Sequence, residues 1–127
     1  MKKVKDIIAA KARSSNTIEP NTLVIDALRK LNDVNLSYLI VMDKDQFKGV
    51  FCERDYTRNV VLKGRSSRDS VVEEVMTTDL PSVQQDDTVE HSMHIMATHG
   101  TRYLLVNEDE QFAGIITIHD LLRQVIA

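Results

Sequence analysis

Cysteine is almost absent from this chain of 127 residues, in which Cys52 is the only one. A single cysteine excludes an intrachain disulfide and any metal site built from several cysteines of one chain. The sequence also has no apolar run approaching the roughly 20 residues of a membrane helix. Its first apolar run, residues 7–10, is too short for the core of a signal peptide. We therefore expect a cytoplasmic protein.

Catalytic loop motifs are missing as well. The chain has only four glycines, and it contains no P-loop, no glycine-rich phosphate loop and no catalytic triad motif. The rest of the composition, 43% hydrophobic and 28% charged residues, is ordinary for a globular domain. None of these common loop motifs therefore points to a catalytic site.

Charge is distributed unevenly along the sequence. Residues 1–65 carry thirteen Lys and Arg against eight Asp and Glu, whereas residues 66–127 carry three against eleven. The net charge of −3 argues against a nucleic-acid binder, because such proteins usually show a basic domain. The asymmetry allows a local anion site in the first half, self-association of unlike halves, or two solvated faces of opposite sign.

The second half of the chain repeats the first. Residues 17–62 align with residues 82–127 without a gap, and many further positions stay apolar in both copies. An earlier similarity between residues 4–8 and 72–76 needs a shift of 68 instead of 65, so the first copy has three extra residues between Ala9 and Asn16. The identical pairs are Val24/Val89, Tyr38/Tyr103, Leu39/Leu104, Val41/Val106, Gln46/Gln111, Phe47/Phe112, Gly49/Gly114, Asp55/Asp120, Arg58/Arg123 and Val60/Val125.

Each copy predicts the element order β-α-β-β-α after a short helical turn. Apolar residues spaced three and four apart predict amphipathic helices near residues 24–34 and 89–97. Polar turns at residues 43–45 and 107–110 predict hairpins between apolar strands. We expect an α/β (α+β) fold in which two motifs, residues 1–62 and 72–127 with a linker at 63–71, pack as a pseudo-twofold pair in one intertwined module.

Two copies that each end in Gly-apolar-apolar-x-x-x-Asp resemble a cystathionine-β-synthase (CBS) domain pair, or Bateman module. The segment Gly49–Tyr56 is similar to stand-alone bacterial and organellar members. The resemblance covers nearly the whole chain and implies binding of AMP, ADP, ATP, NAD or S-adenosylmethionine in clefts between the motifs. It also implies a homodimer and regulation of a partner protein, such as an enzyme, a transporter or a channel.

The resemblance assigns roles to residues of the closing motif. Asp120 and Asp55 are expected to bind the ribose hydroxyls, with help from Thr117 in the second copy, where the first copy has Cys52. His119 and Arg54, which precede the two aspartates, are expected to face phosphate.

The family's other ligand contacts lie before the central strand and at the opening of each repeat. Arg102 matches the arginine that contacts phosphate, and Ser37 stands at its place in the first copy. In the family, the loop that opens one repeat helps to hold the adenine on the aspartate of the other. This pattern assigns Thr17 and Ile18 to the Asp120 site, and Pro81 and Ser82 to the Asp55 site.

Elementary chemistry is consistent with these roles. A carboxylate can accept both vicinal hydroxyls of a ribose through charge-assisted hydrogen bonds. A helix N-terminus offers free N–H groups and a partial positive charge to a phosphate. Arg54, Arg102 and His119 would add donors.

Structural alternatives exist for the same residues. Thr117 and Asp120 also fit a capping box, in which the acid bonds back to its own helix start; Cys52, a poor cap, weakens that alternative for Asp55. Arg54 and Arg102 also fit surface cations, and Lys63, Arg65 and Arg68 a solvated linker. The histidines 91, 94 and 99 fit an outer helix face better than a metal site, because their spacing fixes no third ligand.

We therefore expect a sensor of adenine nucleotides that needs no cofactor and holds no metal. The alternative is a structural dimerisation or interaction module whose clefts stay empty. Cys52 is expected to act as a small apolar filler at its cleft, and Met93 and Met96 as core residues.

Overall fold

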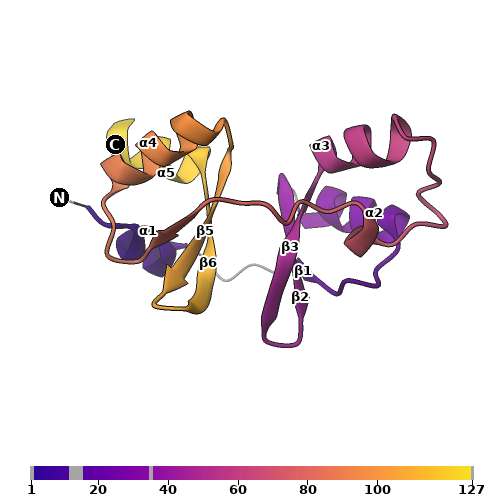
Figure 1. The fold of residues 1–127 in the computed structure, drawn as a ribbon, viewed down its shortest axis with the longest axis horizontal. Coiled ribbons are helices and arrows are strands. Elements are labelled where there is room, and N and C mark those ends of the chain that lie inside the picture. Colours follow the sequence, from indigo (N-terminus) through magenta and orange to yellow (C-terminus); the bar gives the residue numbers. More distant parts are fainter. Residues whose placement is uncertain (1, 12–15, 35, 127) are drawn as a thin grey trace. The chain divides into compact units, whose positions relative to one another are not determined.

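A computed structural model of the chain describes residues 2–11, 16–34 and 36–126. By its contacts the chain divides into two compact units (Figure 1). Unit 1 contains residues 1–12 and 80–127, and unit 2 contains residues 13–79. The first twelve residues thus belong to the unit built from the second repeat.

Unit 2 is built from the first repeat. Its strands pair in the order β1-β2-β3, with β1 parallel and β3 antiparallel to β2. The last helix, α3, continues as a π-helical turn over Thr57–Val61. The elements are β1 (Thr17–Ile18), α2 (Val24–Val34), β2 (Tyr38–Asp43), β3 (Gln46–Cys52) and α3 (Glu53–Tyr56).

Unit 1 has the same arrangement. Its strands pair in the order β4-β5-β6, with the same parallel and antiparallel neighbours. The predicted β-α-β-β-α order and the α+β class are therefore confirmed in both units. The elements are β4 (Ser82–Gln84), α4 (Val89–His99), β5 (Tyr103–Glu108), β6 (Gln111–Thr117) and α5 (Ile118–Ile126).

The gapless repeat extends to backbone irregularities. Both hairpins shift register at the same place, after Val41 in unit 2 and after Val106 in unit 1. Both turns place a non-glycine residue in the left-handed region, Lys44 at φ 57° and Asp109 at φ 56°. A one-residue shift would move every strand side chain to the other face of the sheet, so this agreement shows that the two hairpins share one register.

The short helix before each repeat packs into the unit formed by the other repeat. Helix α1 (Val4–Ala10) places Val4 and Ile7 in the core of unit 1. The 3₁₀ turn Val72–Glu74 and the residue after it place Val72 and Val75 in the core of unit 2. Each repeat therefore supplies core side chains to its neighbour.

Equivalent backbone hydrogen bonds hold these exchanged segments. The N–H of Val4 donates to the carbonyl of Asp87 at 2.9 Å, and the N–H of Val72 donates to the carbonyl of Thr22 at 2.8 Å. Asp87 and Thr22 occupy the same position of the two repeats. The exchange is thus the same contact made twice.

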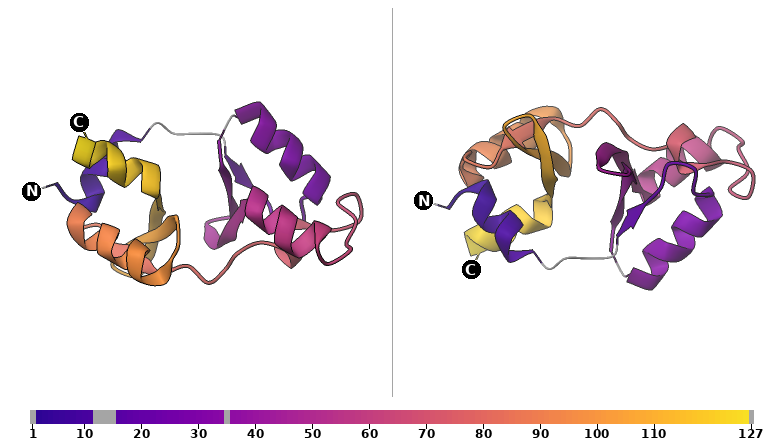
Figure 2. Two further views of the ribbon diagram at one scale, coloured as in Figure 1. Left: turned by 90° about the horizontal axis from the view of Figure 1, so that it is seen from above. Right: turned by 90° about the horizontal axis from the view of Figure 1, so that it is seen from below.

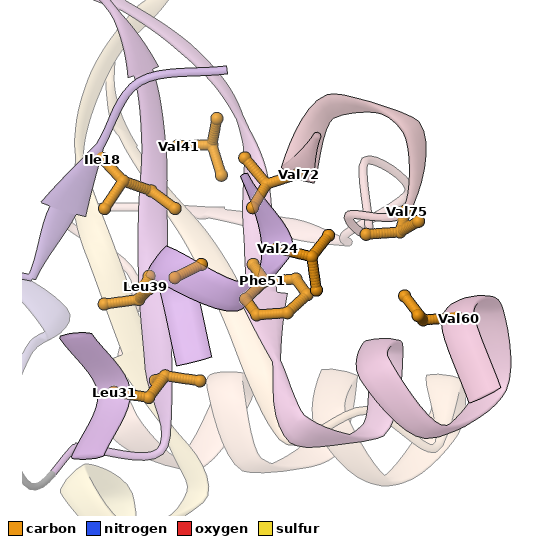
Figure 3. Close-up of a cluster of buried hydrophobic side chains, with 10 residues drawn as sticks. Ile18, Val24, Leu31, Leu39, Val41, Phe51, Val60, Val72 and Val75 are labelled. Carbon is orange, nitrogen blue, oxygen red and sulfur yellow. The ribbon is translucent and has the colours of Figure 1, made fainter. Parts of the chain in front are cut away.

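Helices cover one face of each sheet (Figure 2). In unit 2 the apolar stripe of α2 buries Val24, Ala27 and Leu31, as its spacing predicted. Figure 3 shows side chains from β1, α2 and β2 packed near Phe51 of β3, which is fully buried. In unit 1 Met96 is buried and Met93 packs beside the core, so both methionines are core residues as expected.

The exchange also redistributes charge. Unit 1 holds six Lys and Arg against eight Asp and Glu, and unit 2 holds ten against eleven. The net charges of the units are therefore −2 and −1, although the two halves of the sequence differ strongly. Lys5 and Lys11, from the basic half, pair with Asp86 and Asp120 of the acidic half at 3.7 and 2.9 Å. Across residues 2–11, 16–34 and 36–126, no helix is both long and apolar enough to cross a membrane.

Candidate functional site

Asp120 lies where strand β6 passes into helix α5. Its Oδ2 accepts the backbone N–H of Thr117 at 2.9 Å, and its own N–H donates to Thr117 Oγ1 at 3.2 Å. This is the capping box that the spacing of the two residues allowed, and it is confirmed. The carboxylate is 8% exposed, but a carboxylate has about four lone-pair sites, so this bond leaves acceptor capacity.

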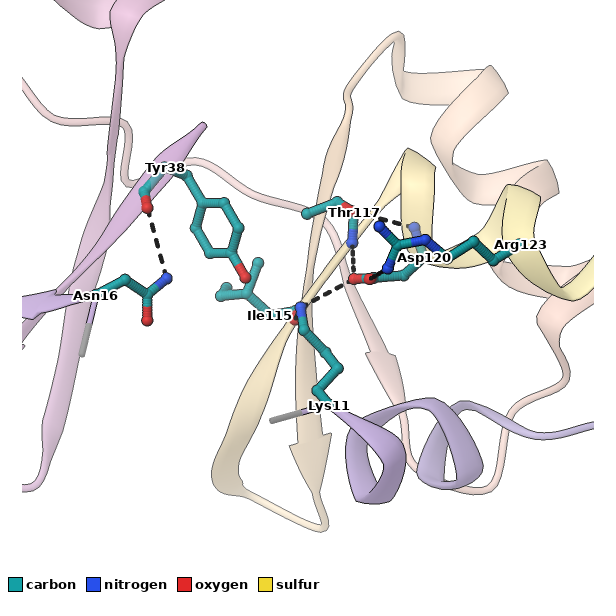
Figure 4. A network of polar contacts seen from close by, with 7 residues as sticks. All are labelled: Lys11, Asn16, Tyr38, Ile115, Thr117, Asp120 and Arg123. Atoms are coloured by element: carbon teal, nitrogen blue, oxygen red, sulfur yellow. Dashed lines mark hydrogen bonds and ion pairs between the residues drawn. The ribbon is translucent and has the colours of Figure 1, made fainter. Parts of the chain in front are cut away.

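Two cations flank the Asp120 carboxylate (Figure 4). The ammonium of Lys11, at the end of α1, donates to Oδ2 at 2.9 Å and to the carbonyl of Ile115 at 2.9 Å. A guanidinium nitrogen of Arg123 lies 3.9 Å from Oδ1. Oδ2 thus has two close donors, whereas Oδ1 makes a long ion pair with Arg123.

Arg102 reaches the same end of unit 1. Its carbonyl accepts the N–H of Ile118, the first residue of α5, at 2.9 Å. The side chains of Arg102 and His119 are exposed. The structure therefore brings the predicted residues Thr117, His119, Asp120 and Arg102 together around the start of α5.

Asp55 occupies the equivalent place between β3 and α3. Its Oδ2 accepts the backbone N–H of Cys52 at 2.9 Å and lies 3.3 Å from the thiol sulfur. Its Oδ1 accepts the hydroxyl of Thr77. The expectation that Cys52 would weaken the capping alternative is wrong, because the backbone N–H of residue 52 is available to the acid whatever side chain it carries.

The Cys52 thiol is half-buried next to this carboxylate. Burial, together with the negative charge of Asp55, raises the pKa of the thiol above its ordinary value of 9.0. The thiolate is the nucleophilic form of cysteine, so the raised pKa favours the protonated, less nucleophilic thiol at neutral pH. It fills space beside Asp55, as expected, and adds a weak donor.

Sequence reasoning missed Lys11 and Thr77, which contact the two carboxylates. Both belong to segments that the exchange brings in, 109 and 22 residues from their partners. Each follows the short helical segment that precedes a repeat, and the three-residue insertion in the first copy was the signal that these segments differ.

Other predicted residues belong to a different unit from the aspartate to which they were assigned. Thr17 and Ile18 belong to unit 2 and Pro81 and Ser82 to unit 1, so neither pair shares a unit with the aspartate it was assigned to. Their roles at the ligand stay predictions. The side chain of Arg54 is exposed at the start of α3.

Ser37, which replaces the expected arginine in the first copy, lines a pocket of about 380 Å³ in unit 2. The other lining residues include the carboxylate of Glu53 and the apolar Leu28 and Leu36. The first copy therefore has a serine and an acidic side chain at this pocket, where the family pattern has an arginine.

The histidines of α4 face outward. His91, His94 and His99 are exposed, and the His99 ring bonds the carbonyl of Ile95 at 3.0 Å. Among the residues that the structure describes, no three His, Cys, Asp or Glu side chains gather as metal ligands.

Proteins of known family match this chain over most of its length. The CBS domain family matches residues 4–62 and again residues 72–127. A CBS-domain protein from Burkholderia ambifaria has a structure with a TM-score of 0.88 and 35% sequence identity, covering 98% of this chain and 94% of that one. The mitochondrial CBS domain-containing protein CBSX3 of Arabidopsis thaliana is 26% identical over 97% of this chain, which spans 64% of that relative.

A more distant structure includes a ligand. CBSX2 in complex with AMP has a TM-score of 0.76 and 22% identity, covering 98% of this chain and 96% of that one. Two matched copies, together with the repeated β-α-β-β-α units, show that this chain belongs to the CBS domain family and is a tandem CBS pair.

Proposed function

We propose that this CBS pair is a regulatory module that senses adenosine-containing ligands and has no catalysis of its own. The observation that carries the proposal is Asp120, a carboxylate at a helix start with an acceptor atom near Arg123 and with Arg102 and His119 at the same end of unit 1. A ribose diol needs such an acceptor, and a phosphate needs the cationic groups beside it.

The ligand class follows from these groups. Arg102, His119 and Arg123 favour a ligand that carries phosphate, so AMP, ADP, ATP and NAD are the first candidates, with S-adenosylmethionine as a cationic comparison. The AMP bound by CBSX2, which shares this fold, makes AMP the first ligand to test.

Thermal melting with each ligand in turn tests the proposal. A ligand at about 100 times its dissociation constant adds roughly 2.7 kcal/mol to the free energy of unfolding. For a chain of this size, that corresponds to a rise in Tm of about 5–15 °C. The shift should disappear in Asp120→Asn and persist in Asp109→Asn, a matched change on the exposed hairpin turn, where asparagine tolerates the left-handed backbone.

The absence of a shift with every ligand would contradict the sensor and favour the structural module. A shift that persists in Asp120→Asn would place the ligand elsewhere. Because Asp120→Asn also removes the pair with Lys11, the ligand-induced shift of each variant is compared with its own unliganded melt.

The proposal includes a homodimer that carries the signal to a regulated partner protein. Helix α5 exposes Leu122, Val125 and Ile126, which are 37%, 61% and 80% exposed. Residues three and four apart lie on one helix face, so these side chains form one apolar row. We assign this row to a second copy of the chain. Sedimentation velocity should show a dimer that Val125→Asp weakens, and a wild-type monomer at all concentrations would contradict the assignment.

A further inference from the structure

The carboxylates of Asp55 and Asp120, which occupy equivalent positions of the two repeats, accept hydrogen bonds from different kinds of donor. In unit 2 the backbone of Thr77 bridges Val50, on strand β3, through two hydrogen bonds of 2.9 Å, one in each direction. The hydroxyl of Thr77 also donates to Asp55, which is 5% exposed. Thr77 therefore donates a hydrogen bond both to the carbonyl of Val50 and to the carboxylate of Asp55, the first through its backbone N–H and the second through its hydroxyl.

In unit 1 a side chain makes the corresponding contacts. Ile115 is the repeat equivalent of Val50, and its carbonyl accepts the Lys11 ammonium at 2.9 Å. The same ammonium donates to Asp120 at 2.9 Å. Lys11 thus replaces two donors of Thr77, its backbone N–H and its hydroxyl, with one charged group.

The longer helix of the first copy explains this replacement. Ala9 is the counterpart of Thr77 under the shift of 68 residues, and it still lies inside α1, which extends to Ala10. A backbone N–H within a helix is committed to the helical hydrogen bonds. The strand carbonyl of Ile115 is therefore reached by a side chain from the helix end.

Different conformational changes are needed to release Asp55 from Thr77 and Asp120 from Lys11. Releasing Asp55 from Thr77 moves a segment held by two backbone hydrogen bonds. Releasing Asp120 from Lys11 requires rotation of a flexible four-carbon side chain that is 28% exposed. The freed ammonium regains water, whereas the freed Asp120 Oδ2 and Ile115 carbonyl become available to ligand donors.

Resting on the proposed function, we propose that Lys11 is a displaceable counter-ion in the Asp120 site, and that the chain binds one adenosine-containing ligand, at Asp120. The ribose hydroxyls take the place of the ammonium on the carboxylate. Asp55, closed by Thr77, serves as a structural copy of the motif. Ligand binding thereby releases the end of α1 from β6, which links occupancy of the site to the packing of the first helix.

Removal of the counter-ion should strengthen binding. A charge-assisted hydrogen bond in a partly exposed site, discounted for solvent screening, corresponds to an effect on the order of tenfold in affinity. Lys11→Met keeps the length of the side chain and removes its charge. Lys5→Met is the matched control, because Lys5 lies on the same helix and its ammonium makes an exposed pair with Asp86 at 3.7 Å.

Isothermal titration with adenosine and with AMP tests both parts of the proposal. We expect one site per chain, lost in Asp120→Asn and kept in Asp55→Asn. Lys11→Met should bind both ligands about tenfold more tightly, and Lys5→Met should bind as the wild type does. Adenosine separates displacement from phosphate contact. Equal or weaker binding of adenosine by Lys11→Met, or two sites per chain, would overturn the proposal.

A measurement on the wild-type chain avoids dependence on the folding of a variant. Acetylation of each lysine, followed by mass spectrometry, should show faster modification of Lys11 when adenosine saturates the site, with Lys5 unchanged. Slower or unaltered modification of Lys11 would overturn the displacement.

The outcomes also separate the two proposals. Binding that depends on Asp120 but is not strengthened by Lys11→Met would leave the sensor standing and remove the counter-ion. Binding by neither the wild type nor Lys11→Met would overturn the sensor, and the counter-ion role with it.

Discussion

Gly49 of strand β3 lies against the backbone of Thr77, so that a side-chain carbon at Gly49 would sit 2.7 Å from the Thr77 carbonyl oxygen. Real side-chain carbons essentially never approach an atom that closely. The close approach of Thr77 to β3 therefore requires a glycine at position 49, the first residue of the repeated motif. In unit 1 the equivalent Gly114 faces Ile8 of α1, so the motif glycine serves the exchanged segment in both units.

Gly49→Ala should destabilise unit 2. The added methyl group has to displace backbone, which is less adaptable than a side chain, and overpacking of this kind costs about 1–3 kcal/mol. Chemical denaturation would measure the loss. Lys48→Ala, on the exposed side of the same strand, should stay within about 0.5 kcal/mol of the wild type. Equal stability of Gly49→Ala and the wild type would show that Thr77 does not cross β3 this closely.

Thr77→Val should destabilise the chain through Asp55. The substitution keeps the shape of the side chain but removes the hydroxyl that donates to a buried carboxylate. Hydrogen bonds to charged groups contribute about 1.5–3 kcal/mol, and we expect a loss in this range by chemical denaturation. The neighbouring Thr78 is exposed, so Thr78→Val is the matched control. A loss as large in Thr78→Val would assign the effect to the loop and not to Asp55.

Much of the fold could be predicted because its signals are local. Short stretches of sequence were enough to predict the helix that buries Val24, Ala27 and Leu31, and the turns at Lys44 and Asp109. The equivalence of Asp55 and Asp120 followed from a repeat without gaps, and the capping geometry followed from the three-residue spacing of Thr117 and Asp120.

The closing contacts of the site could not be predicted in the same way. Lys11 meets Asp120 across 109 residues, and no local pattern records a contact that depends on where a preceding helix packs. The insertion after Ala9 shows that the two copies differ there, but only the helix length in the structure shows that a lysine replaces a backbone bridge. The exchange also brings the unevenly charged halves together, since it places Lys5 and Lys11 beside acidic residues of the second repeat.

Thr88→Ala should destabilise α4. The Thr88 side chain accepts the N–H of His91 at 3.0 Å and caps the helix, and the loss of such a cap costs about 0.5–2 kcal/mol. Thr88→Ser retains the hydroxyl and should stay close to the wild type when both are unfolded with denaturant. The first repeat has Leu23 at this position, but both repeats satisfy the N–H of the next residue in the same way: Val24 donates to the carbonyl of Ser70 at 2.9 Å and Val89 to that of Lys2 at 3.2 Å. If Thr88→Ser loses as much stability as Thr88→Ala does, packing of the methyl group is responsible and not the cap.

The Cys52 thiol should make stability depend on pH in the alkaline range. Its pKa is raised in the folded chain by burial and by Asp55, so the folded state holds the proton more tightly than the unfolded state does. The stabilisation is fully present below the ordinary pKa of 9.0, and it is lost as the pH rises through the higher folded pKa. Cys52→Ser has no thiol to titrate, and its free energy of unfolding should fall less over the same interval. Subtracting one denaturation series from the other removes the titration of lysine and tyrosine, which both chains share. Parallel pH profiles for the two chains would contradict the raised pKa, because they would mean that the thiol has the same pKa in the folded and unfolded states.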